Sequence, residues 1–284
     1  MSERIVTQPQ VSVILPVRNG AATIEAAIAS LQNQTFPHFE VIAVNDGSRD
    51  DTSEILHRIA QRDPRIRPLA QPPKGIVPAL LTGLEHARAD IIARMDADDW
   101  CAPHRLERQL DYLAMHPSVG VVGSLVEFGG DRERQAGYAA YVDWLNSMVT
   151  AEEIQCNRFV ESPLAHPSVL FRRRCLEIGG TYRDGAFPED YELWLRWLEA
   201  GIRMAKVPEP LLTWNDPPGR LSRTNKRYSM TAFYKCKAEY LARWLARNNP
   251  LHPGIHVWGS GRLTRKRAEL LVALGIRIDG YIDL

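Results

Sequence analysis

Three carboxylates fall close together in the segment Asp96-Ala97-Asp98-Asp99. The segment follows Asp90–Met95, whose short β-branched run predicts a buried strand. The acids therefore stand at a strand's carboxyl end, where open α/β sheets bind their ligands. Carboxylates this close repel one another unless a cation lies among them, and Mg²⁺ or Mn²⁺ suits such oxygen ligands and bridges to a substrate phosphate. The segment indicates either a metal–diphosphate site or a solvated acidic turn before a helix at Pro103.

The elements that must position these acids alternate regularly along the chain. Short β-branched or apolar runs predict strands at Val11–Leu15, Phe39–Val44, Ile66–Ala70, Val119–Phe128 and Pro167–Arg172. Periodic apolar residues and helix-start signals predict helices at Ala21–Gln32, Asp51–Gln61, Pro78–Arg88, and from Pro103 onward. Asp51 and Glu54 have the spacing of a capping box. Such alternation predicts an α/β fold with a mostly parallel sheet and helices on both faces.

The composition excludes several classes of protein. With 284 residues and 45% hydrophobic content, the chain can form one large α/β domain with an appendage, or two small domains. A formal net charge of +1 provides no global field for nucleic acid, so no such partner is expected. No apolar run is long enough to span a bilayer, and Met1–Gln10 lacks a signal-peptide core. The scattered cysteines predict reduced thiols in a cytosolic protein: Cys101, Cys156, Cys175 and Cys236.

Five short motifs occur in a specific order: Leu15-Pro16-Val17-Arg18-Asn19, Val44-Asn45-Asp46-Gly47-Ser48, Arg94-Met95-Asp96-Ala97-Asp98-Asp99, His166-Pro167-Ser168-Val169 and Glu189-Asp190-Tyr191-Glu192-Leu193-Trp194. In that order, over about Val11–Ser222, the chain resembles a family 2 glycosyltransferase of the GT-A fold. The resemblance implies a Rossmann-like sheet, a nucleotide-sugar donor and a divalent cofactor, Mn²⁺ or Mg²⁺.

The resemblance also implies donor-side roles for individual residues. Pro16 and Arg18 match positions where the nucleotide base and ribose pack. Asp46 matches the aspartate that accepts a hydrogen bond from the base, which is typically uracil. Asp96 matches the first acid of the D-x-D motif, near the ribose or the metal, and Asp98 matches the metal ligand.

On the acceptor side, Asp190 matches the catalytic base of inverting members, and Glu189 is a supporting residue beside it. An acceptor hydroxyl is a poor nucleophile until a base takes its proton. A carboxylate at the start of a helix suits this role because the helix dipole keeps it ionised. Asp99 is expected to orient the site from behind the metal ligands.

Several of these assignments have a structural alternative. Asp46-Gly47-Ser48 is also an ordinary turn, and Asp190 could be a helix N-cap. His166 is a candidate substrate or metal contact, although a histidine more often serves the structure alone. Arg94 either supplies cationic help to the nucleotide or is a buried partner of the acids.

The chain departs from the family pattern near Gly75. Polar residues that many relatives carry there are replaced by Pro73, Leu80 and Leu81, so their contacts to the donor are absent. Lys74 is then the candidate cation of that loop.

The Q-x-x-R-W motif of processive polysaccharide synthases is also missing, which predicts a single addition of sugar. Arg220 and Arg223 lie in the corresponding region. They are interpreted either as a lid over the diphosphate or as part of a solvated loop.

Three domains are predicted: a GT-A domain over 1–224, an amphipathic helix or linker over 225–250, and a partial Rossmann-like βαβ appendage over 251–284. The appendage carries Gly259-Ser260-Gly261 between a strand and a helix, but Thr264 occupies the third glycine position. A docking appendage or the remnant of a longer parent is therefore favoured over a nucleotide site. The helix Tyr228–Arg247 has a basic face, which either stays solvated or holds the chain against anionic lipid.

The resemblance implies an inverting, metal-dependent transferase that moves a sugar from a nucleotide-sugar, most simply a UDP-sugar, to a glycan or lipid-linked acceptor in bacterial surface-glycan synthesis. The expected location is cytoplasmic, with peripheral contact at the inner membrane face as a further hypothesis. Two alternatives remain open. A sugar-1-phosphate nucleotidyltransferase would need a glycine-rich loop after the first strand, which Leu15–Gly20 lacks. A non-catalytic glycan-binding module on the same fold would not need Asp98 and Asp190.

Overall fold

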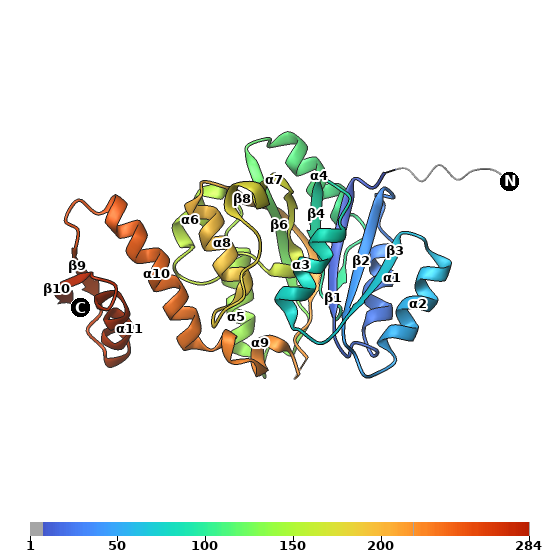
Figure 1. The fold of residues 1–284 in the computed structure, drawn as a ribbon. Helices are drawn as coiled ribbons and strands as arrows, with labels where there is room; N and C mark the ends of the chain where they lie inside the picture. Colours follow the sequence, from blue (N-terminus) through green and yellow to red (C-terminus); the bar gives the residue numbers. More distant parts are fainter. Residues whose placement is uncertain (1–7, 218, 284) are drawn as a thin grey trace. The chain divides into compact units, whose positions relative to one another are not determined.

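The computed structural model describes residues 8–217 and 219–283 (Figure 1). The chain divides into two compact units: the first joins Met1–Tyr182 with Gly201–Pro217, and the second joins Arg183–Ala200 with Pro218–Leu284. The domain limits expected from the sequence stay a prediction. The expectation for Met1–Gln10 falls largely on residues 1–7, which lie outside the described part of the chain.

The first unit is built on an eight-stranded sheet with the order β3-β2-β1-β4-β7-β6-β8-β5. Its strands are β1 Val11–Val17, β2 Phe39–Asp46, β3 Ile66–Gln71, β4 Ile91–Arg94, β5 Trp100–Cys101, β6 Val119–Phe128, β7 Leu170–Arg172 and β8 Arg203–Trp214. Strands β3, β2, β1 and β4 are parallel, as are β6 and β8, whereas β7 and β5 pair antiparallel to their neighbours. The predicted mostly parallel sheet is confirmed.

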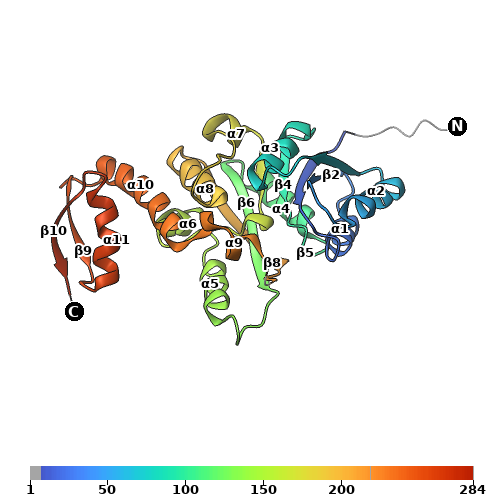
Figure 2. The same ribbon diagram turned by 60° about the horizontal axis from the view of Figure 1, so that its bottom comes forward.

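Helices cover both faces of this sheet because side chains along β1 alternate in direction. Val13 and Leu15 belong to one apolar cluster with Ile28 of α1. Ile14 points the other way, and a Cβ on Gly83 of α3 would lie only 2.4 Å from its Cγ2 atom. The helices of this unit are α1 Ile24–Gln32, α2 Thr52–Arg62, α3 Ile76–His86, α4 Arg105–Met115, α5 Ala136–Asn146, α6 Ala151–Asn157, η1 His166–Ser168 and α7 Arg174–Gly179. Helices α4 and α5 both contact β6 (Figure 2).

Some local expectations are wrong. Asp51 stands at the N-cap of α2 but makes no capping hydrogen bond; instead Asp50 accepts the Thr52 N–H at 3.2 Å. The strand expected from Pro167 begins only at Leu170, because the residues before it form the short helix η1. Strand β8 continues across the Pro208–Pro210 stretch, where its pairing with β6 shifts in register.

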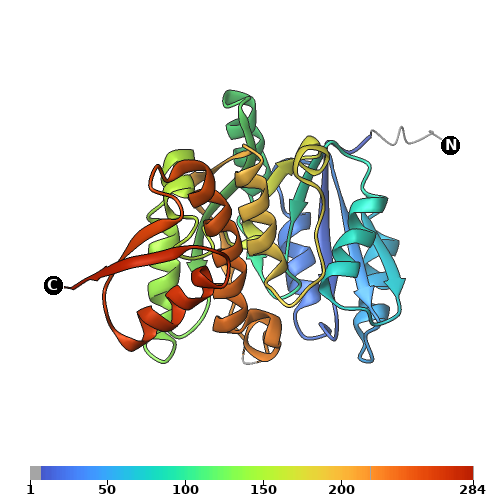
Figure 3. The same ribbon diagram turned by 60° about the vertical axis from the view of Figure 1, so that its left-hand side comes forward.

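The second unit contains α8 Glu189–Glu199, α9 Leu221–Thr224, η2 Lys226–Tyr228, α10 Met230–Asn248, β9 Gly254–Trp258, α11 Arg262–Val272 and β10 Arg277–Ile282. Strands β9 and β10 are parallel and are connected through α11, as predicted for the tail (Figure 3). Ala238 and Ala242 of α10 form a small core with Leu271 and Ile276. Among the helices of the described residues, none combines the length and apolarity that crossing a membrane requires.

Lys206 of β8 provides a test of the first unit's core. It is fully buried, and its ammonium group donates to the Leu145 carbonyl. Burial lowers the pKa of Lys206 to about 7, although the charge of Glu153 acts in the opposite direction. Between this value and the ordinary 10.5, the unfolded chain binds more protons than the folded chain, so stability rises with pH.

We expect Lys206→Met to remove a slope of up to about 1.4 kcal/mol per pH unit from the free energy of unfolding in that window. Urea unfolding of both proteins over a pH series measures the slopes. Lys266→Met, at an exposed position, serves as the control and should keep the slope of the unmodified chain. Identical slopes for all three proteins would contradict the assignment.

Candidate active site

The three acids after β4 converge in space. Asp96, Asp98 and Asp99 each present a carboxylate oxygen, and these oxygens lie within 4.8 Å of one another. Asp96 and Asp98 are partly exposed, whereas Asp99 is buried. Because carboxylate oxygens are the ligands preferred by Mg²⁺ and Mn²⁺, this donor set fits a divalent cation.

The end of β8 fixes the loop that carries these acids. Asp99 Oδ1 accepts the backbone N–H of Asn215 at 2.8 Å, and the Asn215 side-chain amide donates to the Asp98 carbonyl at 2.6 Å. Immediately after the acids, Trp100 and Cys101 form β5 and pair with β8. The acid loop is therefore held by a strand that lies more than a hundred residues further along the chain.

Two buried arginines lie behind the acids. Arg94, at the end of β4, forms an ion pair with Asp96. Arg105 of α4 is fully buried and donates to the Arg94 carbonyl at 2.7 Å. Burial disfavours the charge of Arg94, but the carboxylate of Asp96 outweighs it and raises the pKa of the guanidinium. These contacts match the reading of Arg94 as a buried partner of the acids, and help to the nucleotide stays a prediction.

His166 lies in the same buried region. Its Nε2 atom is 2.7 Å from the Tyr182 hydroxyl. Burial and then the charge of Arg94 hold the pKa of His166 well below its usual range, so the imidazole is neutral at pH 7. The contact with Tyr182 favours a structural role, and a contact with substrate or metal stays a prediction.

Asp46 fixes the loop after β3. Its carboxylate accepts hydrogen bonds from the Gln71 side chain at 2.7 Å and from the backbone N–H groups of Lys74 and Gly75 at 2.8 Å each. A Cβ on Gly47, whose φ is +66°, would lie 2.6 Å from Pro73 Cδ, so the turn after β2 packs directly on this loop. Asp46 thus has a structural role, and its contact with a base stays a prediction.

The register of the sheet brings the predicted donor residues to one edge. Val17 of β1 pairs with Asn45 of β2, and Ile14 of β1 pairs with Arg94 of β4. The residues that follow these three strands therefore emerge side by side, among them Arg18 and the acids. Pro16 is buried within β1, and Arg18 is exposed just beyond it.

The predicted base belongs to the second unit, in the first turn of α8. The N-cap of this helix is Pro188, so Asp190 is its second residue and not its cap. Asp190 Oδ1 accepts the N–H of Tyr191 at 2.7 Å. The predicted lid residues of the same unit adjoin or lie in α9, with Arg220 partly exposed and Arg223 exposed.

Glu189 is buried beside Asp190 and is held by η2. The Tyr228 hydroxyl lies 2.8 and 2.7 Å from its two oxygens, and Arg227 lies 3.7 Å away. Burial, followed by the charge of Asp190, raises the pKa of Glu189 well above its usual range. The first turn of α8 therefore carries two acids with different environments.

Sequence reasoning missed several residues that build these sites: Arg105, Tyr182, Asn215, Arg227 and Tyr228. None of them lies in a motif that indicates a chemical function, and each makes contacts with residues far away in the sequence. The only available signal was their polar character next to predicted apolar elements, which many surface residues share.

Residues 12–178 match the family described as Glycosyl transferase family 2. The chain is 32% identical over 197 residues to the amylovoran biosynthesis glycosyltransferase AmsE of Erwinia amylovora, covering 66% of this chain and 69% of that protein. It is 28% identical over 250 residues to the O-antigen biosynthesis glycosyltransferase WbnJ of Escherichia coli, covering 86% and 92%.

Solved structures show a similar fold. The structure of S. aureus TarS 1-349 in complex with UDP-GlcNAc has a TM-score of 0.63 at 18% identity, over 93% of this chain and 71% of that one. The mannosyltransferase PcManGT from Pyrobaculum calidifontis, in complex with GDP-Man and Mn²⁺, has a TM-score of 0.59 at 22% identity, over 94% and 69%. These likenesses confirm the predicted fold class.

Because Asp99 is buried and Asp98 is partly exposed, replacing each of them should lower the free energy of unfolding by a different amount. Asp99→Ala should destabilise the chain by about 1–3 kcal/mol, because it removes a buried carboxylate and leaves the partly buried Asn215 N–H without its acceptor. Asp98→Ala should cost less, since its side chain is partly exposed and its carbonyl still accepts from Asn215. Urea unfolding measures both.

Both variants should weaken Mn²⁺ binding, measured from the free-ion signal by electron paramagnetic resonance. Asp90→Ala changes an exposed aspartate before the same strand and should alter neither quantity. Mn²⁺ affinity unchanged in Asp98→Ala would rule out this loop as the metal site.

Proposed function

Since this chain belongs to glycosyltransferase family 2, we propose that it is an inverting transferase that moves one sugar from a UDP-sugar to an acceptor hydroxyl. The observation that carries the proposal is the convergence of three carboxylates within 4.8 Å after β4. That position lies at the edge where β1, β2 and β4 end together. It suits a diphosphate neutralised by a divalent cation.

On the donor side, Asp98 and Asp96 would hold the cation, either Mn²⁺ or Mg²⁺, while Asp99 keeps their loop in place. A divalent cation bound there would stabilise the negative charge of the leaving diphosphate. Arg18 and Pro16, at the end of β1, would contact the base and ribose. Asp46 would support them by holding the neighbouring loop and presenting its remaining acceptor capacity to uracil.

On the acceptor side, Asp190 would take the proton from the attacking hydroxyl. The acceptor oxygen then bonds to the anomeric carbon as the bond from that carbon to the diphosphate oxygen breaks. The nucleoside diphosphate leaves on the opposite side, so the configuration is inverted. Glu189 would keep the first turn of α8 in position through Tyr228.

The biological setting follows from the relatives. The names of two of them refer to amylovoran and O-antigen biosynthesis. We therefore place this chain in bacterial surface-glycan synthesis, with a glycan or a lipid-linked sugar as the acceptor. The missing Q-x-x-R-W motif supports a single addition.

Nucleotide release from a panel of UDP-sugars and GDP-sugars tests the reaction, with Mn²⁺, Mg²⁺ or EDTA in parallel. We expect UDP from at least one UDP-sugar, only when a divalent ion is present. Release from GDP-sugars alone would overturn the donor assignment. Formation of pyrophosphate from UTP and a sugar 1-phosphate would instead identify a nucleotidyltransferase, and donor binding without release would identify a binding module.

Asp190→Asn should lower transfer about 10²–10⁴-fold, because a general base contributes that much, and should leave UDP-sugar affinity unchanged. Asp279→Asn, at a position in β10 of the same unit, is the matched control and should retain full activity. Calorimetric titration with the UDP-sugar and a divalent ion measures affinity separately from turnover. A large loss of affinity in Asp190→Asn would place this residue on the donor side.

We also propose peripheral membrane contact through α10 and the residues before it. Ion pairs to Asp184 and Glu199 already engage part of the predicted basic face, namely Arg227, Arg243 and Arg247. Lys226 and Lys235 are exposed, as is Trp244, so they would carry the contact. Anionic vesicles should co-sediment more protein than neutral vesicles at low salt, and Lys226→Gln with Lys235→Gln should abolish the difference. Equal recovery with both vesicles would end this proposal.

A further inference from the structure

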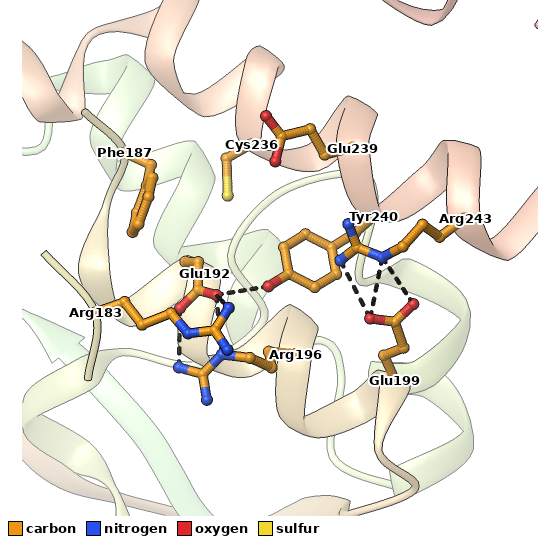
Figure 4. A pocket seen from close by; sticks show the side chains of 9 residues that line it. All are labelled: Arg183, Phe187, Glu192, Arg196, Glu199, Cys236, Glu239, Tyr240 and Arg243. Atoms are coloured by element: carbon orange, nitrogen blue, oxygen red, sulfur yellow. Dashed lines mark hydrogen bonds and ion pairs between the residues drawn. The ribbon is translucent and has the colours of Figure 1, made fainter. Parts of the chain in front are cut away.

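A pocket of about 380 Å³ opens within the second unit, between α8, α10 and the segment that precedes α8 (Figure 4). Three arginines and three glutamates line it: Arg183, Arg196, Arg243, Glu192, Glu199 and Glu239. This volume lies at the lower end of the range for small-molecule sites, which suits a sugar ring and is small for a whole nucleotide-sugar.

A buried ion pair forms the floor of the pocket. Arg196 donates to both oxygens of Glu192, at 2.9 and 3.0 Å, and the Tyr240 hydroxyl donates to the same carboxylate at 2.6 Å. At the other end, Arg243 binds Glu199 through contacts of 3.0–3.2 Å. These bonds fix the charged groups before any ligand arrives, which reduces the entropy that binding must overcome.

The lining favours an uncharged polar ligand. Equal numbers of guanidinium and carboxylate groups give the pocket no net charge at pH 7, so neither an anion nor a cation is preferred. Burial, and then the charge of Glu192, raises the pKa of the Cys236 thiol to about 12, so this group is neutral as well. Planar charged groups that donate and accept in the same pocket match the vicinal hydroxyls of a sugar.

Aromatic rings supply the second half of this recognition. Phe187 and Tyr240 both line the pocket, and Figure 4 shows their rings on two different sides of it. The C–H face of a pyranose is apolar and can pack against such rings while its hydroxyls reach the charged groups.

The proposed base does not line the pocket, but it precedes Glu192 of the lining by two residues on the same helix. Phe187 lies only three residues before Asp190, and Arg183 belongs to the same segment. Across the pocket, Cys236 of α10 lies near enough to Asp190 for that carboxylate to contribute to its raised thiol pKa. A sugar held here would therefore lie close to the group that must take its proton.

We propose that this pocket binds a neutral hexose ring of the acceptor, packed on Phe187 and hydrogen-bonded by Arg183 and the Glu192–Arg196 pair. The identification as an acceptor site rests on the proposed transferase function, whereas binding of the sugar does not. Uronic acids and other charged sugars are disfavoured, because the pocket has no unbalanced charge to offer them.

Saturation-transfer-difference NMR on the full chain tests the proposal, with methyl glycosides of glucose, galactose, N-acetylglucosamine and glucuronic acid as probes. We expect at least one neutral glycoside to bind, and methyl glucuronide to bind more weakly. Arg183→Gln should reduce that affinity about tenfold, the equivalent of roughly one hydrogen bond to a charged group, and Phe187→Leu should reduce it by a similar factor through loss of the ring contact. Both changes are at exposed or partly exposed positions, and a UDP thermal shift with Mn²⁺ verifies that the donor site persists.

Arg262→Gln, at an exposed arginine of α11 outside the pocket, is the matched control and should bind the glycoside normally. Binding that none of the variants weakens would place the sugar elsewhere and overturn the proposal. Stronger binding of the glucuronide would overturn the assignment to a neutral sugar. Absence of all glycoside binding in a chain that releases UDP would refute this pocket alone, whereas glycoside binding without any nucleotide release would refute the proposed function alone.

Discussion

Repulsion among the carboxylates of Asp96, Asp98 and Asp99 is the constraint on which the first unit depends. Two arginines buried behind them, Arg94 and Arg105, offset part of that repulsion from the protein side. Burying a guanidinium costs free energy, and the cost is repaid only while ionised partners stay close. Negative charge remains in excess on the solvent-facing side of the three acids, and a divalent cation can neutralise it. The acids are thereby preorganised before any cation binds.

The order of the strands explains why the acids stand where they do. From β1 the sheet continues through β2 and β3 in one direction, and through β4 in the other. The strand order therefore reverses at β1, and in open α/β sheets ligands bind at such a switch point. The short connection from β4 to β5 places all three acids at this switch point. Asn215, at the end of β8, then prevents the loop from spreading.

The sequence predicted what depends on local pattern and failed where distant residues decide. Periodicity and motif spacing are local properties, so they predict the strands that begin at Val11 and Phe39 and the acids after Arg94. Asn215 could not be anticipated, since its contact with Asp99 exists only once β8 has joined the sheet. Similarly, no local pattern around Glu189 predicts that the Tyr228 hydroxyl donates a hydrogen bond to it. Buried polar partners of this kind are specified by the tertiary structure, which a single sequence does not reveal.

In the proposed function, helix α8 would carry both the base and one wall of the sugar pocket. Glu189, Glu192, Arg196 and Glu199 are spaced so that they share one stripe of the helix, whereas Asp190 lies about 100° around from Glu189. The same stripe thus contacts Tyr228 at its first turn and Tyr240 further along. A helix of this length moves as a unit, so any change that shifts the floor of the pocket also shifts the turn that carries Asp190. Proton transfer requires a base and an acceptor ring to be held within fractions of an ångström, and if Asp190 and the pocket act as proposed, one helix would meet that requirement without a separate hinge.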